Sequence, residues 1–300
     1  MNVLLATYNG SKFLREQLDS IGSQTLPVAR ITVRDDGSTD STLSVLEEWA
    51  AGRPNVRLLR GPRLGFAKNF FALLTSPDQE SDFFAFSDQD DVWLPDKIER
   101  AVRALGEGDA DEPSLYCSRL ELVDDNLKHL SFSRVPRRID FANALVENVA
   151  TGCTMVLNRA ARDLISERLP EKAVFHDWWC YLAIAALGKV IFDETPRIKY
   201  RQHANNQVGA TASRVKFFKR RLERFFRHAG GVQPRSDQAQ EFNRCCGALL
   251  VGRDKEILDR FLSVRGNIRE RITYSAAMDV WRQSWFDTTL LRVMIVMGRV

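Results

Sequence analysis

Strand-like and helix-like hydrophobic patterns alternate along the first 110 residues of the chain. Strands are predicted at residues 3–6, 31–33, 56–59 and 83–86. Helices are predicted to start near residues 11, 43, 65 and 96. A strand that is regularly followed by a helix builds a parallel sheet, because the connection has to return across one face of the sheet. We therefore expect an α/β fold with a mostly parallel central sheet and flanking helices.

The pattern becomes less regular beyond residue 110. Further strands are expected at residues 115–118, 154–157, 190–192 and 198–200, with a helix at residues 177–187. After a boundary near Gly209–Ser213 the sequence has helical patterns and no clear strand. We therefore expect a sheet-containing domain at residues 1–212 and a helical C-terminal region at residues 213–300.

Composition limits the class of protein. A chain of 300 residues with 44% hydrophobic content can bury a large core. It opens directly into a strand pattern instead of a secretion signal, and no apolar run approaches the ~20 residues of a membrane span. Its five cysteines are odd in number and lack CxxC spacing, which favours reduced core thiols over zinc ligands or disulfides. These features predict a cytoplasmic protein.

Three carboxylates in four residues follow the last of the four N-terminal strands. Asp88, Asp90 and Asp91 come directly after the apolar run Phe83–Phe86, and a second acidic turn, Asp35–Asp40, follows an earlier strand. We expect the two turns to meet at one edge of the sheet, which is where open α/β sheets bind ligands. Clustered carboxylates repel one another unless a cation neutralises them, and oxygen ligands suit Mg²⁺ or Mn²⁺. A lone Asp-x-Asp would more often be a solvated turn, but two such turns favour a metal site.

Six short blocks of sequence occur in an order that is specific for one family. They are Ala6–Gly10, Asp35–Asp40, Gly65–Phe70, Ser87–Asp91, His176–Trp179 and Tyr200–His203. In these blocks the chain resembles the family 2 glycosyltransferases, which are inverting enzymes of the GT-A fold. Within that family it is similar to rhamnosyltransferase-like members of bacterial surface polysaccharide pathways. The resemblance spans roughly residues 2–209 and says less about the sugar than about the family.

The resemblance implies a binding site for a nucleotide-sugar donor, formed by Thr7, Tyr8, Asp36, Arg63, Lys68 and Asp88. Tyr8 and Asp36 would hold the nucleotide base, with Asp36 accepting a hydrogen bond from a pyrimidine ring N–H. Asp88 would contact the ribose side of the donor. Lys68 or Arg63 would be the cationic partner of the phosphates.

The resemblance also implies the metal ligands and the catalytic base. Asp90 would bind the Mg²⁺ or Mn²⁺ that bridges the donor diphosphate, and His203 would approach the metal or the diphosphate. On spacing alone His203 would be a surface histidine. Asp177 matches the catalytic base, although an Asp before an apolar helix is more commonly an N-cap. We expect the helix dipole to favour its ionised form.

Two adjacent tryptophans follow this aspartate. Trp178 and Trp179 could both be core aromatics, but two adjacent indoles on a helix are not expected to face the same core. We therefore predict that one of them lines an acceptor cleft where sugars stack.

The segment from Ser213 to His228 is strongly basic and carries an aromatic stripe. Seven basic residues against one acid give it +6, which leaves −2 of the net +4 for the rest of the chain. Such a helix either lies on an anionic membrane surface or packs its phenylalanines on the catalytic domain, and the sequence does not favour one over the other. The local nature of the charge argues against nucleic-acid binding.

The sequence thus predicts a metal-dependent inverting glycosyltransferase. The expected reaction transfers L-rhamnose from dTDP-rhamnose to a glycan or lipid-linked glycan acceptor in bacterial O-antigen or capsule synthesis. A UDP-hexose donor is the first alternative, and a non-catalytic GT-A binding subunit is the second. The expected location is cytoplasmic, with a peripheral position on the inner face of the cytoplasmic membrane as an option.

Overall fold

The computed structural model describes residues 1–78, 80–173, 175–203, 234–264 and 267–300. Its centre is a seven-stranded sheet of order β10-β6-β9-β4-β1-β2-β3. The strands are β1 (Asn2–Thr7), β2 (Arg30–Asp35), β3 (Val56–Arg60), β4 (Phe83–Ser87), β6 (Ser114–Ser118), β9 (Val156–Asn158) and β10 (Lys189–Asp193). Only β9 runs antiparallel to its neighbours in this sheet. The predicted mostly parallel sheet is confirmed.

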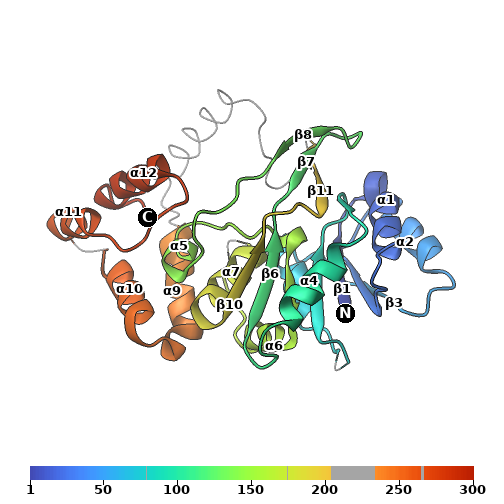
Figure 1. The fold of residues 1–300 in the computed structure, drawn as a ribbon, viewed down its shortest axis with the longest axis horizontal. Helices are drawn as coiled ribbons and strands as arrows, with labels where there is room; N and C mark the ends of the chain where they lie inside the picture. Colours follow the sequence, from blue (N-terminus) through green and yellow to red (C-terminus); the bar gives the residue numbers. More distant parts are fainter. Residues whose placement is uncertain (79, 174, 204–233, 265–266) are drawn as a thin grey trace.

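A second, smaller sheet lies beside the central one at the end where β7 and β8 are labelled in Figure 1. Its order is β5-β11-β7-β8, with β5 (Val92–Trp93), β11 (Ile198–Arg201), β7 (Glu121–Val123) and β8 (His129–Phe132). Of these four strands the sequence predicted β11 alone. The sheet matters for the site because β5 directly follows the acidic turn at Asp88–Asp91, and β11 ends two residues before His203.

Helices cover both faces of the central sheet (Figure 1). They are α1 (Ser11–Gly22), α2 (Thr42–Ala50), α3 (Phe66–Leu74), α4 (Lys97–Gly106), α5 (Phe141–Ala144), α6 (Arg159–Glu167) and α7 (His176–Leu187). One core cluster contains side chains of α1, α2 and α4, and the other contains side chains of α3, α5, α6 and α7. Helices α1 to α4 bury the apolar stripes that predicted them, and this burial supplies most of their stability.

The described part of the C-terminal region is helical, as predicted. It contains α9 (Pro234–Cys246), the 3₁₀ turn η3 (Gly247–Leu249), α10 (Gly252–Ser263), α11 (Ile268–Ala276) and α12 (Trp285–Val296). These helices share a core with α5 and α7, since Phe242 packs against Phe141 and Trp179 at ring-centroid distances of 5.5 and 6.1 Å. The predicted boundary at Gly209–Ser213 and the basic segment 213–228 lie outside the described residues.

Two predictions from composition can be compared with the structure. All five cysteines are free; Cys245 is half-buried and the other four are buried, in agreement with their interpretation as core thiols. In the part of the chain that the structure describes, none of the helices is both long and apolar enough to span a bilayer.

Candidate active site

The turns that follow β1, β2 and β4 lie side by side, because β1 pairs in parallel with both other strands. Hydrogen bonds connect them directly: the Asn9 N–H donates to Ser38 Oγ, and the Gly10 N–H donates to Thr42 Oγ1, each at 2.8 Å. On the other side of the β1 turn, the Tyr8 N–H donates to Gln89 Oε1 at 2.8 Å. The two acidic turns therefore meet at one edge of the sheet, as predicted.

The neighbouring carboxylates Asp35 and Asp36 differ in how many acceptor sites are already used. Both Asp35 oxygens are occupied, one by the N–H groups of Gly37 and Ser38 and the other by the hydroxyls of Thr7 and Ser38. A carboxylate has about four acceptor sites, so Asp35 is saturated. Thr7 is buried and its hydroxyl donates to Asp35, so it supports the turn; its place in the donor site stays a prediction.

Asp36 retains acceptor capacity. One oxygen accepts from Arg34 Nη1 and from the Leu64 N–H, both at 2.7 Å, and the other accepts from the Gly65 N–H at 2.8 Å. Three of about four acceptor sites are thus used. The remaining site fits the predicted contact with a ring N–H, which Asp35 could not make.

Arg34 is a site residue that sequence reasoning missed. Its guanidinium is buried and bonds to Asp36, to Asn69 Oδ1 at 2.7 Å and to the Pro62 carbonyl at 3.0 Å. A Cβ on Gly61 would overlap this guanidinium, so the glycine leaves room for it. The available signal was an arginine directly after the apolar run Ile31–Val33, because a charge that a buried strand carries into the core requires a partner.

The two predicted phosphate partners are both exposed. Arg63 lies over the ring of Tyr8, with 4.5 Å between its Cζ and the ring centroid. Lys68 lies in the first turn of α3. Arg63 is therefore the cation that the structure brings next to a predicted base-binding residue.

Asp90 and His203 face each other although 113 residues separate them. His203 Nε2 lies 2.7 Å from Asp90 Oδ2, and the imidazole packs against Phe13 with 5.3 Å between ring centroids. This approach follows from the second sheet, in which β5 pairs with β11. At this separation the two side chains form a hydrogen bond. The Asp90 carboxylate is the ligand type that suits Mg²⁺ or Mn²⁺, and the His203 nitrogen beside it is a second potential donor.

Asp88 lies in a field of negative charge. Its pKa is raised well above the usual range, first by burial and then by the carboxylates of Asp90 and Asp177. Like charges that approach one another in a buried site destabilise the ionised forms unless a cation is bound. The predicted metal ligand Asp90 and the predicted base Asp177 thus both act on the carboxyl group of Asp88.

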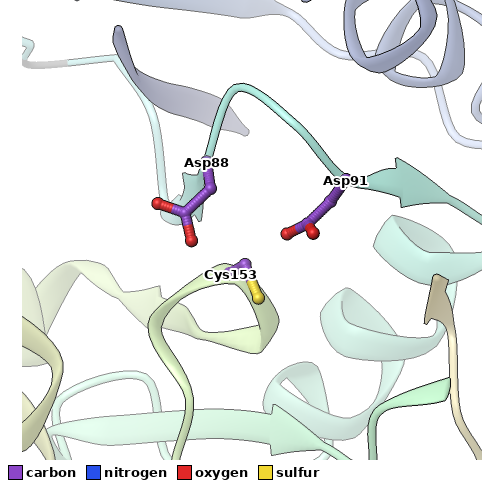
Figure 2. A group of neighbouring side chains, drawn as sticks. All are labelled: Asp88, Asp91 and Cys153. Atoms are coloured by element: carbon purple, nitrogen blue, oxygen red, sulfur yellow. The ribbon is translucent and has the colours of Figure 1, made fainter. Parts of the chain in front are cut away.

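Figure 2 shows a second group of potential metal ligands. Asp88, Asp91 and Cys153 offer ligand atoms within 4.8 Å of one another. Burial, with the negative charges of Asp91 and Asp88, raises the pKa of the Cys153 thiol well above its usual value. Sulfur is also a soft ligand, which suits Mg²⁺ or Mn²⁺ poorly. The buried Lys97 ammonium also faces Asp91. This group therefore fits a hard divalent ion less well than Asp90 and His203 do.

Asp177 is the second residue of α7, and Phe175 is the N-cap. Its carboxylate accepts hydrogen bonds from the Trp178 N–H at 2.7 Å and from the Gly152 N–H at 3.1 Å. The N-cap alternative is therefore wrong. Burial raises the pKa of Asp177 to about 6, although these N–H donors and the Asn148 side chain lower it. The expectation of a net shift toward the ionised form is corrected, because desolvation outweighs the helix terminus.

His176 is a second residue that sequence reasoning did not single out. It is buried and stacks on Phe70 at 3.9 Å between ring centroids, with Phe66 and Phe86 at its edges. Burial lowers its pKa to about 3, so the ring is neutral. It fixes the start of α7, from which Asp177 projects.

The premise that two adjacent indoles do not face the same core is wrong for Trp178 and Trp179. Trp178 and Trp179 are only 8% and 0% exposed, and both lie in the same core cluster. The Trp178 indole N–H donates to the Ala144 carbonyl at 2.7 Å. Both can be buried because α7 is covered on one side by the sheet and on another by the C-terminal helices. A role of either indole in acceptor binding stays a prediction.

Comparison with known proteins identifies the family. The family described as Glycosyl transferase family 2 matches residues 2–164, more than half of the chain. The chain belongs to this family. A "dTDP-rhamnosyl transferase RfbG" from Shigella flexneri is 32% identical over 227 residues, which cover 72% of this chain and 77% of that protein. An uncharacterized glycosyltransferase from Rickettsia typhi is 24% identical over 209 residues, and the match covers 64% of its length.

Solved structures of other glycosyltransferases share the fold of this family 2 protein. S. aureus TarS 1–349 in complex with UDP-GlcNAc matches 99% of this chain and 86% of its own, with a TM-score of 0.60 and 17% identity. The mannosyltransferase PcManGT from Pyrobaculum calidifontis, in complex with GDP-Man and Mn²⁺, matches 99% of this chain and 79% of its own, with a TM-score of 0.52 and 20% identity. The protein is a glycosyltransferase with the GT-A fold.

Proposed function

We propose that this family 2 enzyme is a metal-dependent, inverting glycosyltransferase that transfers L-rhamnose from dTDP-rhamnose to a glycan or lipid-linked glycan in bacterial surface polysaccharide synthesis. The observation that carries the proposal is the position of Asp88, whose carboxylate lies within the electrostatic reach of both Asp90 and Asp177. The relative named as a dTDP-rhamnosyl transferase favours rhamnose. A UDP-hexose donor is the alternative, because TarS shares the fold and was solved with UDP-GlcNAc.

On the donor side, Asp36 would accept a hydrogen bond from the base, and Arg63 would lie close to it over Tyr8. Asp90 and His203 would hold Mg²⁺ or Mn²⁺, which supplies positive charge beside the departing diphosphate. Asp88 would face the ribose side. This arrangement would orient the donor so that the acceptor can attack the anomeric carbon from the face opposite the diphosphate.

On the acceptor side, Asp177 would remove the proton of the attacking hydroxyl. A hydroxyl is a weak nucleophile until a base takes its proton during attack. A pKa of about 6 leaves Asp177 largely ionised at neutral pH and still basic enough to accept that proton. One carboxylate suffices for this single displacement, because the leaving diphosphate needs no separate acid.

A thermal-shift screen of dTDP, UDP and GDP, each with and without Mn²⁺, tests the donor assignment. We expect a Mn²⁺-dependent shift that is largest with dTDP. A melting-temperature shift with UDP alone would favour a UDP-hexose donor over dTDP-rhamnose. Shifts of equal size with and without Mn²⁺ would contradict the proposed metal dependence. Asp177→Asn should then keep the dTDP shift and lose transfer, and transfer at the wild-type rate would reject Asp177 as the base.

Contact with an anionic membrane through residues 213–228 and a location at the inner face of the cytoplasmic membrane remain proposals. The full chain should co-sediment with vesicles of phosphatidylglycerol and phosphatidylcholine and not with phosphatidylcholine alone, if the basic segment meets lipid. Absence of co-sedimentation with the anionic vesicles would reject membrane contact.

A further inference from the structure

Gln89 lies between Asp88 and Asp90 in the turn that follows β4, which we call the metal-side turn. Its side chain points instead to Tyr8 in the turn that follows β1, which we call the base-side turn. Its Oε1 accepts the Tyr8 N–H at 2.8 Å, and its Nε2 donates to the Tyr8 carbonyl at 3.0 Å. One carboxamide therefore satisfies both backbone groups of a single residue, 81 positions away in the sequence. A backbone residue in a sheet makes the same pair of bonds.

The position of this contact in the sheet explains its form. The parallel ladder between β1 and β4 ends at the pair Leu5↔Ser87. Gln89 lies two residues beyond that pair, and Tyr8 three residues beyond it. The Gln89 side chain thus extends the connection between the two strands past the point where their backbones separate.

Gly10 provides an independent indication that this contact is specified by the sequence. Its φ of −110° is accessible to any residue, so the backbone does not require glycine. A Cβ at this position would instead overlap the Gln89 carboxamide. The glycine and the glutamine therefore form a matched pair.

We propose that Gln89 is a positioning residue that holds the base-side turn at Tyr8 and the metal-side turn at Asp88 and Asp90 in a fixed relation, so that one rigid frame receives both ends of a nucleoside diphosphate. This inference rests on the proposed function for the identity of the ligand. It predicts that the loss of the Gln89 side chain lowers affinity most for ligands that contact both turns. A nucleoside, which reaches the base-side turn alone, should depend on it less.

The main test compares wild type with Gln89→Met, which keeps the length of the side chain and removes both hydrogen bonds. Affinities for dTDP and for thymidine are measured by calorimetry with Mn²⁺ present. We expect the dTDP dissociation constant to rise roughly tenfold, as the loss of two neutral hydrogen bonds would give, with a change for thymidine of less than about threefold. Unchanged dTDP affinity, or an equal loss for both ligands, would overturn the proposal.

Gln24→Met is the matched control for a general loss of stability. Gln24 also donates to a carbonyl, that of Leu94 at 2.9 Å, and accepts the Ile98 N–H at 3.1 Å. These contacts join the segment that follows α1 to Leu94 and the first turn of α4, and they involve no residue of the two turns. This variant should lower the melting temperature and leave dTDP affinity unchanged; a similar loss of dTDP affinity in both variants would reduce Gln89 to a structural role.

A double-mutant cycle separates this inference from the proposed function, because it needs no ligand. Gly10→Ala should lower the melting temperature in the wild-type background and have little effect in a Gln89→Ala background, where the overlap is removed. Additive effects would overturn the pairing of Gly10 with Gln89. If neither dTDP nor UDP binds wild type while the cycle is strongly non-additive, the donor assignment fails and the Gln89 contact stands.

Discussion

At the scale of single residues, the pKa of Asp177 sets an expectation for pH dependence. Burial raises it to about 6, whereas an unfolded aspartate has a value of 3.8. A base acts in its deprotonated form, so kcat/KM should fall about tenfold per pH unit below pH 6. Rates measured between pH 4.5 and 8 with saturating Mn²⁺ test this. A profile that stays flat down to pH 5 would contradict the assignment of Asp177 as the base.

The same shift has a consequence for stability. The pKa of Asp177 is higher in the folded than in the unfolded state, so folding favours the protonated carboxyl. The stability that this preference contributes is fully present below pH 3.8 and is lost as the pH rises through about 6. Asp177→Asn should therefore be inactive yet at least as stable as wild type at pH 7.5, and the two should converge in stability near pH 4.

Arg34 gives a second residue-scale prediction. Its buried guanidinium is the partner of the buried Asp36 carboxylate at 2.7 Å. Removing one member of a buried ion pair costs about 3–5 kcal/mol, because the other charge remains desolvated. Arg34→Met should lower the free energy of unfolding in urea by about that amount. The exposed pair of Arg103 with Glu99 is the control: Arg103→Met should cost about 1 kcal/mol or less. Equal costs in the two variants would contradict this account.

At the scale of elements, the sequence patterns predicted the helices and strands that are long enough to show a hydrophobic period. The central strands and α1 to α4 each carry several apolar residues at the right spacing, so their types were predictable. Strands β5, β7 and β8 were missed, because strands of two to four residues have too few positions for a period and depend on their partners in the second sheet. Helix α1 begins at Ser11, as predicted; Gly10 is its N-cap, and the Ser11 hydroxyl donates to Asp40.

The contact between α7 and the 3₁₀ turn η1 (Gly152–Thr154) also belongs to this scale. A Cβ at Gly152 would lie 2.8 Å from His176 Nε2 and 3.3 Å from Asp177 Cβ. Gly152→Ala should push the start of α7 away and displace the base. We expect kcat to fall about tenfold to a hundredfold with little change in dTDP affinity.

Gly106→Ala is the matched control for this prediction, since nothing lies within 4 Å of a Cβ at that position. It should retain wild-type kcat. Loss of dTDP affinity in Gly152→Ala, comparable to its loss of kcat, would show that η1 supports the donor side instead of the base.

At the scale of the whole molecule, the site depends on residues that come together only through tertiary structure. Six sequence blocks pointed to the family, and the pairing of Asp90 with His203 followed from them. Arg34, Gln89 and His176 were not singled out, because their roles depend on which neighbours the fold supplies: a carboxylate, a backbone turn and a set of phenyl rings. The burial of both Trp178 and Trp179 likewise depends on helices that lie more than 50 residues later.

This dependence on later helices leads to a prediction about cooperativity. Phe242 of α9 is fully buried and contacts Trp179 of α7 and Phe141 of α5, so the C-terminal helices and the catalytic part share one core. Phe242→Ala should destabilise the protein by about 3–5 kcal/mol, the usual cost of emptying a buried phenylalanine site. Because the core is shared, unfolding should remain a single transition when it is followed by far-ultraviolet dichroism and by tryptophan fluorescence. Val251→Ala, at a position that is 83% exposed, should change little. Two separate transitions, with only one of them moved by Phe242→Ala, would show that the helical region folds independently of the sheet.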